Sequence, residues 1–321
     1  MDYTEYTAAK SRLGANPNLC ELFKLLAIET WKRIEYAYIK DRIKVYETTL
    51  TQNLIFSINA YNDQYGLNIE IFEAINENAN GNDLELIIRY PGEGLEFYAP
   101  VQAKKVYKNG RYLSMDHGDQ IESLLKYAEG TKSEPFYLLY NYTPSPLKPS
   151  VTLTSPNALT GCTLISAHHL FNNYYNARLR RKADGSTEAA WIIPNFFDLN
   201  PSPAFAWHEI VCPGKAVELQ GILKEKQIRK ASETSTALVP LSQFNRSFYP
   251  INTFQKDSGW INIKDLSATS NYDTGRTLTS ISDFDDSQSL KRIEKSEQEK
   301  YTPIFAPKSR IVVTQNQASK K

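Results

Sequence analysis

Three polar residues of the types used in metal and proton chemistry lie on two neighbouring predicted strands. Residues 81–107 are predicted to form two strands joined by a Gly/Pro turn. Side chains alternate between the two faces of a strand, so Gln102 and Lys104 share a face. If the two strands are antiparallel neighbours, we expect Asp83 to converge with Gln102 and Lys104 near one end of a sheet.

These residue types suit metal-assisted hydrolysis of a phosphodiester. Carboxylate and amide oxygens hold a hard cation such as Mg²⁺, which polarises the phosphate and acidifies a bound water. An ammonium helps to position that water and offsets the charge of the pentavalent phosphate. Glu85 lies on the same strand face as Asp83 and could act as a further acid. The structural alternative is an ion pair between Lys104 and Asp83 in a closed cleft.

The spacing of these residues resembles a known superfamily of nucleases. Asp83 is followed, after eighteen residues, by Gln-Ala-Lys at 102–104. This pattern resembles the PD-(D/E)XK restriction-endonuclease-like nucleases, and more narrowly the Mrr-type variant in which glutamine replaces the second acid. The resemblance is densest over residues 43–142. It implies Mg²⁺ or Mn²⁺ held by Asp83 and Gln102, with Lys104 as the catalytic lysine. Because the glutamine removes one negative charge, the resemblance also implies weaker cation binding.

Periodicity predicts an αβββαβ order of elements around this pattern. The expected elements are a helix over 45–61, strands over 67–74, 81–90 and 95–107, a helix over 120–128 and a strand over 135–142. The order matches the core that the resemblance implies, an α/β fold with a mixed central sheet flanked by helices. We therefore predict a restriction-endonuclease-like core with a C-terminal extension.

Two further residues are candidates because they begin the two predicted helices. Glu47 opens the first helix, and the resemblance implies that it points toward the metal as a further ligand or a water-orienting base. The alternative is a first-turn glutamate favoured by the helix dipole. Gln120 opens the second helix, where relatives place a glutamine or tyrosine near the site. The alternative for Gln120, an accessory candidate, is a solvated residue at a helix start.

A basic run is the candidate contact to nucleic acid. It consists of Arg178, Arg180, Arg181 and Lys182 at the end of a helix predicted within residues 158–182. Clustered guanidinium groups contact phosphates, although cations at a helix end also suit the helix dipole. Residues 1–145 carry a net charge of about −5 and residues 146–321 about +6, an asymmetry that suits a polyanionic substrate.

The length of 321 residues and a hydrophobic content of 41% predict one substantial core. The expected domain organisation is a flexible arm over 1–17, a nuclease-like core over 18–145, additional elements packed on the core over 146–215, and a partly disordered C-terminal extension over 216–321. From about residue 265 the scarcity of large apolar residues predicts a mobile segment that the core does not need.

Cysteine usage and apolar runs predict a compartment. The three cysteines are an odd count without a CxxC pair, which argues against a disulfide framework. His208 and Cys212 could supply half of a zinc site on a helix, but no matching pair of ligands stands out. The N-terminus does not have the pattern of a signal peptide, and no apolar run reaches membrane-spanning length. We expect a reduced cytoplasmic compartment and no membrane association.

The combined prediction is a metal-dependent endodeoxyribonuclease. The resemblance alone implies a role in bacterial defence against phage or foreign DNA, with RNA as an open alternative substrate. Because the sequence has no P-loop, we expect the trigger to be modified or damaged DNA or a regulatory or sensor protein, and we expect a homo-oligomer. The alternative is a catalytically decayed nuclease fold that binds nucleic acid or a partner protein in a defence complex, which metal-dependent cleavage would distinguish.

Overall fold

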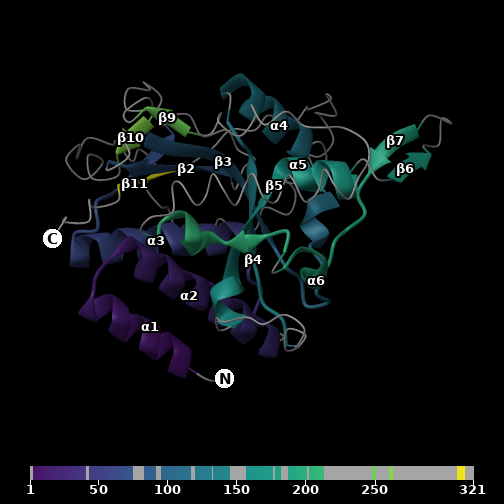
Figure 1. Ribbon diagram of the computed structural model, residues 1–321. Helices are drawn as coiled ribbons and strands as arrows, with labels where there is room; N and C mark the ends of the chain where they lie inside the picture. The colour runs from purple at the N-terminus through teal and green to yellow at the C-terminus, as the bar shows by residue number, and fades with distance from the viewer. Residues whose placement is uncertain are drawn as a thin grey trace, which may run out of the picture.

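The structure is a computed structural model that describes most of the first 212 residues and three later segments. The described residues are 3–40, 43–74, 83–91, 95–116, 120–131, 133–144, 157–175, 178–181, 187–200, 202–212, 248–250, 260–262 and 309–314. Within these residues the chain is mixed α/β, as expected (Figure 1).

The predicted order of a helix, three strands, a helix and a strand is present. These elements are α3 (Glu47–Tyr65), β1 (Ile69–Ala74), β2 (Asp83–Tyr90), β3 (Leu95–Lys105), α4 (Gln120–Thr131) and β4 (Phe136–Tyr140). Helix α3 buries Leu50, Leu54 and Ile58, which are spaced four residues apart, and it ends at Gly66 with a φ of 63°. Local periodicity therefore accounts for the elements that carry the candidate residues.

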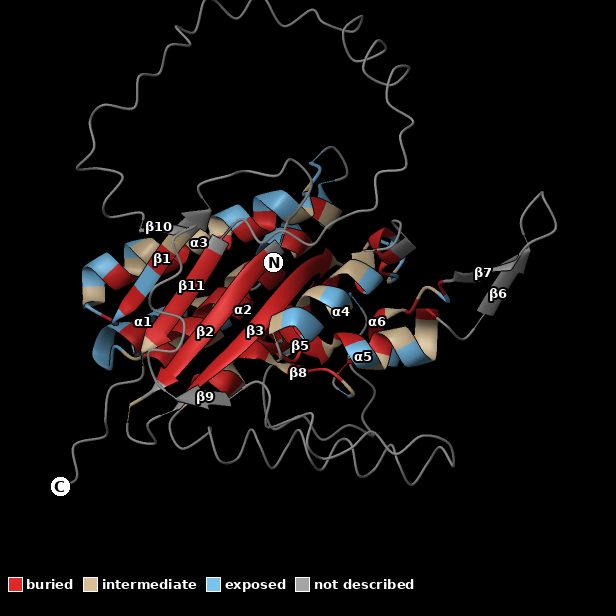
Figure 2. Cartoon of the chain, turned by 90° about the horizontal axis from the view of Figure 1, so that it is seen from above, coloured by how far each residue is buried: buried red, intermediate tan, exposed pale blue. Residues whose placement is uncertain are grey.

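One mixed sheet forms the centre of the molecule. Its further strands are β5 (Cys162–Ser166), β8 (Phe205–Ala206), β9 (Phe248–Pro250), β10 (Trp260–Asn262) and β11 (Ser309–Thr314). The strand order is β10-β1-β11-β2-β3-β4-β5-β8, and β9 pairs with β3. The pairings β11–β2 and β3–β4 are parallel, whereas the other pairings in the sheet are antiparallel. Figure 2 shows that the central strands are buried.

The two faces of the sheet differ in chemistry. One face carries apolar side chains such as Leu84 and Leu86, which join the main core with residues of α2 (Leu19–Ile39) and α3. The opposite face, under α4, carries buried polar groups such as Glu85 and Arg89. Figure 1 shows α1, α2 and α3 on one side of the sheet and α4 on the other. The face of the sheet on which each candidate strand residue lies therefore determines whether its neighbours are apolar or polar.

The predicted flexible arm at residues 1–17 is wrong where the structure describes it. Residues Thr4–Ala15 form α1, which packs on α2 and buries Ala9 and Leu13. The two buried side chains lie four residues apart on one stripe of the helix, so α1 is held by contact with α2. Its otherwise polar composition conceals this short stripe.

The helix predicted within residues 158–182 is present only over residues 167–175, and it does not end in the basic run as predicted. This stretch contains a 3-10 turn (Asn157–Gly161), β5, a short helix α5 (Ala167–Leu170), a π-helical turn (Phe171–Tyr175) and β6 (Arg178–Arg181). β6 pairs with β7 (Thr187–Ala190) in a separate two-stranded ribbon. The remaining elements are α6 (Phe196–Leu199) and 3-10 turns at Leu113–Asp116 and Trp207–Ile210.

The C-terminal segment contributes a central strand, which corrects the prediction of a dispensable tail. β11 lies between β1 and β2 and pairs with both. Its residues Ile311, Val312 and Val313 are buried. A strand with neighbours on both sides fills the sheet, so the core depends on it. Most of residues 213–308 and all of 315–321 lie outside the described residues, and so does most of the prediction of disorder.

A disulfide joins Cys20 at the start of α2 to Cys212, which contradicts the expectation of no disulfide and removes the cysteine argument for a reduced compartment. The odd count arises because Cys162 remains a buried free thiol. Pairing across 192 positions of sequence leaves no local spacing signal. Among the described residues, no helix is both long and apolar enough to cross a membrane.

Candidate active site

The register of β2 and β3 places two candidate ligands opposite each other. The two strands are antiparallel, as expected, and the Cα atoms of Asp83 and Gln102 are direct partners. Side chains of direct partners lie on the same face of the sheet. Only the backbone of Asp83 belongs to the described part of the chain. Lys104 follows Gln102 by two residues on the same face of β3.

Lys104 is held by the residue that begins α4. Its Nζ donates a hydrogen bond to Oε1 of Gln120 over 2.8 Å. Gln102 and Lys104 are only 4% and 3% exposed. The amide oxygen of Gln120 accepts a hydrogen bond from the ammonium and carries no charge of its own, so this contact fixes the direction of the ammonium group. The accessory candidate Gln120 therefore lies beside the candidate lysine.

Glu47, at the start of α3, lies near the same end of β3. The region formed by Asp83, Gln102, Lys104 and Glu47 is called the candidate corner below. The Oε1 atom of Glu47 accepts a hydrogen bond from the backbone N–H of Lys105 over 3.1 Å and a second, short one from Oγ of Ser114. Successive N–H groups of a strand point to opposite sides, and the N–H of Val106 points toward Tyr140 of β4. The N–H of Lys105 therefore points toward the β2 side of β3. The Glu47 carboxylate lies on that side, where β2 begins with Asp83.

The surroundings of Glu47 mix cationic and aromatic groups. The Nζ of Lys105 lies 3.9 Å from the centre of the Tyr107 ring. Burial lowers the pKa of Lys105, and the neighbouring Glu47 carboxylate partly opposes this shift. Burial and the charge of Glu47 both raise the pKa of Tyr107. The negative charge of Glu47 is therefore felt by at least two titratable neighbours.

Glu85 does not fit the expected role of a spare acid ligand. Its Oε1 accepts hydrogen bonds from the hydroxyls of Tyr98 and Tyr127, the first over 2.5 Å. Its Oε2 accepts a hydrogen bond from Nε of Arg310 over 2.7 Å and forms an ion pair with Nη2 of the same residue over 2.6 Å. The side chain of Glu85 is fully buried. Four charge-assisted contacts commit this carboxylate to the space under α4, so a metal would have to displace them.

Ser114 and Arg310 are the site neighbours that sequence reasoning missed. Ser114 lies within residues 112–119, whose polar composition is typical of a loop, and it carries no distinguishing pattern. Arg310 lies in Ser-Arg-Ile-Val-Val-Thr at 309–314, whose β-branched residues are typical of a strand. That signal is present in the sequence, but the polar composition of the residues before it conceals it.

The basic run does not end a helix. Arg178, Arg180 and Arg181 lie on β6, opposite residues of β7, and Lys182 lies outside the described residues. Side chains of β6 are likewise outside the described part of the chain. Figure 1 shows the β6–β7 ribbon projecting from the body of the molecule. The alternative based on a helix dipole therefore does not apply to this run.

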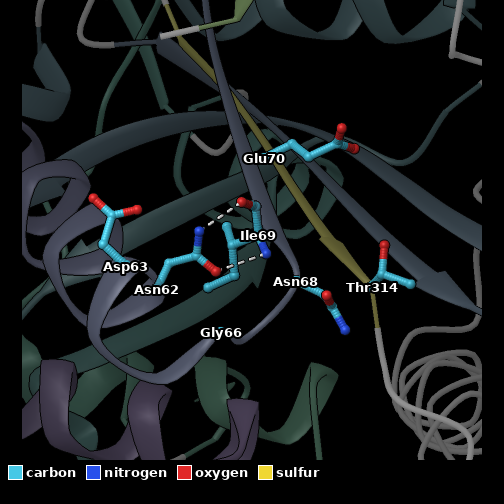
Figure 3. A pocket seen from close by; sticks show the side chains of 7 residues that line it. All are labelled: Asn62, Asp63, Gly66, Asn68, Ile69, Glu70 and Thr314. Atoms are coloured by element: carbon cyan, nitrogen blue, oxygen red, sulfur yellow. Dashed lines mark hydrogen bonds between the residues drawn. The ribbon is translucent and has the colours of Figure 1, made fainter. Parts of the chain in front are cut away.

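A pocket of about 540 Å³ lies at the opposite end of β2 from Asp83 (Figure 3). Its lining residues are Asn62, Asp63, Gly66, Asn68, Ile69, Glu70 and Thr314. Asn62 uses its side chain to bond both backbone groups of Ile69, and Glu70 pairs with Arg89 over 3.1 Å. The polar groups at Asn62 and Glu70 therefore serve the fold, and the pocket is separate from the candidate corner.

The donor set of the corner fits a hard cation. Asp83, Gln102 and Glu47 offer carboxylate and amide oxygens, the ligands preferred by Mg²⁺ and Mn²⁺. Among the side chains that the structure describes, no group of three His, Cys, Asp or Glu residues could hold a metal ion, and Asp83 is outside that set. Cys212 is bonded to Cys20, so the half zinc site suggested with His208 has no thiolate.

Comparison with known proteins identifies one family. The model of a family described as a family of unknown function (DUF6615) matches residues 19–318, from the first residue of α2 to beyond β11. No curated protein and no solved structure matches the chain.

Proposed function

The chain belongs to DUF6615, and from the corner where β2, β3, α3 and α4 meet we propose that it is a metal-dependent nuclease with a restriction-endonuclease-like core. The observation that carries the proposal is the register of β2 and β3, which sets Asp83 opposite Gln102. Lys104 follows on the same face, and Glu47 reaches the same side of β3. Residues from three separate elements thus supply the groups that phosphodiester hydrolysis requires.

The residues of the candidate corner and Gln120 divide three roles in the proposed reaction: metal binding, charge compensation and positioning. Asp83, Gln102 and Glu47 would hold Mg²⁺ or Mn²⁺, which when bound supplies a Lewis acid for the phosphate and an acidified water. Lys104 offsets negative charge that develops on the phosphate. Gln120 fixes the Lys104 ammonium by its 2.8 Å hydrogen bond, which reduces the entropy lost when substrate binds.

The proposal extends to substrate and setting. The excess of basic residues after position 145 suits DNA, and the aromatic and cationic residues near Glu47 suit bases and phosphates. Bacterial defence, a cytoplasmic location, a homo-oligomer and activation by the nucleic acid or by a sensor protein complete the proposal.

The experiment measures cleavage of plasmid, single-stranded DNA and RNA with Mg²⁺, Mn²⁺ or EDTA. Asp83→Asn and Lys104→Met should each reduce metal-dependent cleavage by at least about a hundredfold, because each removes charge that acts on the transition state. Methionine retains the volume of the buried lysine stem, which limits the disturbance of packing. Gln102→Glu should lower the Mg²⁺ concentration needed for half-maximal cleavage, because it adds a charged oxygen ligand. Lys108→Met, an exposed lysine three residues after β3, is the matched control and should cleave as the wild type does.

The burial of Gln102 and Lys104 favours one alternative, a decayed nuclease fold that binds nucleic acid or a partner. Two measurements, cleavage with each metal and binding in EDTA, distinguish the two functions. If the wild type cleaves none of these substrates with either metal, yet binds nucleic acid equally well in EDTA, the catalytic proposal is wrong and the binding module is correct.

A further inference from the structure

The C-terminal strand introduces a buried cation next to the candidate metal ligands. In β11 the Cα of Arg310 is the direct partner of the Cα of Glu85 in β2. The Arg310 side chain is 6% exposed, and both of its contacting nitrogens bond the same carboxylate oxygen. These two residues are separated by 225 positions in sequence. The pair therefore forms only when β11 packs beside β2 in the folded sheet.

Glu85 is close enough to the candidate ligands to compete with them. It follows Asp83 by two residues on the same face, a displacement of about 7 Å along the strand. The tyrosine hydroxyls that donate hydrogen bonds to its carboxylate nevertheless lie on the side away from Asp83. The Cα of Tyr98, a donor to Glu85, pairs with Ile87, which lies beyond Glu85 from Asp83. Tyr127 donates from the second turn of α4, away from the end of this helix that holds Lys104.

We propose that Arg310 is a positioning residue that holds the Glu85 carboxylate out of the metal site. The inference rests on the proposed function. An uncompensated carboxylate this close to the ligands attracts a divalent cation, and an effective dielectric constant near 20 leaves that attraction strong. The guanidinium of Arg310, through the hydrogen bond from Nε and the ion-pair contact of Nη2, compensates the charge of Glu85 and fixes the direction of its carboxylate. The C-terminal strand thereby determines the charge of the site.

A second buried ion pair, which joins β2 to β3, provides a matched control. Arg89 of β2 lies on the same face as Glu85, and its Nε bonds Glu96 of β3 over 3.4 Å. The Arg89 side chain is 10% exposed and that of Glu96 is fully buried. Arg89 lies six residues from Asp83, about 20 Å along the strand. A change at Arg89 therefore removes a comparable buried charge at a site remote from the corner.

The experiment compares Mn²⁺ binding, measured by titration calorimetry on nucleic-acid-free full-length protein, with cleavage at saturating Mn²⁺. Arg310→Gln should bind Mn²⁺ roughly tenfold more tightly, because Glu85 gains an uncompensated charge, while cleavage falls roughly tenfold because the cation is displaced toward Glu85. Arg310→Lys retains the charge and should restore both values toward wild type. Arg89→Gln should lower the melting temperature as Arg310→Gln does and leave Mn²⁺ binding unchanged.

The double variant Glu85→Gln/Arg310→Gln keeps the inference testable if Arg310→Gln does not fold. Replacing both partners by neutral groups is the least costly change to a buried pair. Mn²⁺ affinity should return to the wild-type value. Weaker binding by the double variant would make Glu85 a ligand, and unchanged or weaker binding by Arg310→Gln would make Arg310 purely structural; either result overturns the inference alone. A wild-type protein that neither binds Mn²⁺ nor cleaves overturns the metal site and the inference together.

Discussion

Two buried acids of the fold, Glu85 and Glu134, are stabilised by different means. Glu85 is matched by Arg310 and two tyrosine hydroxyls. Glu134, just before β4, accepts a hydrogen bond from Oγ of Ser166 over 2.7 Å, and His168 lies 3.9 Å from its other oxygen. Burial raises the pKa of Glu134 to about 7, and the Ser166 hydrogen bond only partly opposes this shift. Glu134 is thus a buried acid that gains a proton on folding near neutral pH.

The shifted pKa of Glu134 predicts how stability depends on pH. A raised folded-state pKa contributes stability that is present below the unfolded value of 4.5 and is lost as the pH rises through about 7. This decrease is up to about 3 kcal/mol at pH 8. Glu134→Gln cannot ionise and retains the acceptor for Ser166. Urea unfolding should therefore show the variant gaining stability relative to wild type between pH 5 and pH 8.

The exposed acid Glu122 on α4 provides the control for this measurement. Glu122→Gln removes one negative charge at the surface, so comparison with it separates the effect of burial at Glu134 from the effect of the lost charge. Parallel pH profiles for the wild type and Glu134→Gln would show that Glu134 ionises normally in the folded protein.

At the scale of elements, α4 connects the candidate corner to the buried polar network. Its first residue, Gln120, holds Lys104, and Tyr127 two turns later holds Glu85. The seven positions from Gln120 to Tyr127 span about 10 Å along the helix axis. On β3, the residue opposite Glu85 is Pro100, and the four positions from Pro100 to Lys104 span a comparable distance along the strand. One rigid helix therefore sets both the orientation of the lysine and the direction of the buried acid.

The β6–β7 ribbon is the element that we expect to contact nucleic acid. The affected residues are Arg178, Arg180, Arg181 and Lys182, which should all be replaced by alanine. Binding to double-stranded DNA should weaken, and the slope of log affinity against log salt should flatten by up to ~0.9 for each phosphate that the variant no longer neutralises. Fluorescence anisotropy at four salt concentrations measures both changes.

A control with the same change of charge separates local contacts from net charge. Four exposed cations on helices and their ends, Lys10, Arg33, Lys40 and Lys126, should be replaced by alanine together. We expect a smaller change of slope than for the ribbon. Equal slopes for both quadruple variants would contradict a specific role for β6.

At the scale of the whole molecule, segments distant in sequence complete the same sheet. β11 fills the position between β1 and β2, and the disulfide joins the start of α2 to Cys212. β1 and β2 follow each other in the chain, yet neither pairs with the other. The sheet is therefore continuous only when the C-terminal strand is present.

Truncation tests this dependence on β11. A chain that ends at residue 308 lacks three buried β-branched side chains, each worth about 1.5–3 kcal/mol of burial, and it exposes the edges of β1 and β2. Circular dichroism should show that its thermal unfolding is no longer cooperative. A chain that ends at residue 314 retains β11 and should melt as the full chain does. Cooperative unfolding of the shorter chain would restore the prediction that the C-terminal segment is dispensable.

Much of the candidate site could be predicted from the sequence because its geometry is local. The strands β2 and β3 are joined by a short turn, so their alternation and pairing determine that Asp83 lies opposite Gln102. The start of α3 at Glu47 and of α4 at Gln120 follows from helical periodicity. The sequence could not determine what holds these residues, such as the hydrogen bond from Lys104 to Gln120.

The tertiary structure alone decided the role of the chain ends and the use of Glu85. A run of six residues such as 309–314 has the pattern of a strand, but its neighbours depend on which sheet edges remain open after the rest has folded. From sequence, Glu85 shares a face with Asp83 and could serve a metal. In the fold, Arg310, which is 225 positions away in sequence, binds that carboxylate through a hydrogen bond. Pairing between distant segments follows from the free energy of the complete sheet, and local periodicity does not contain that information.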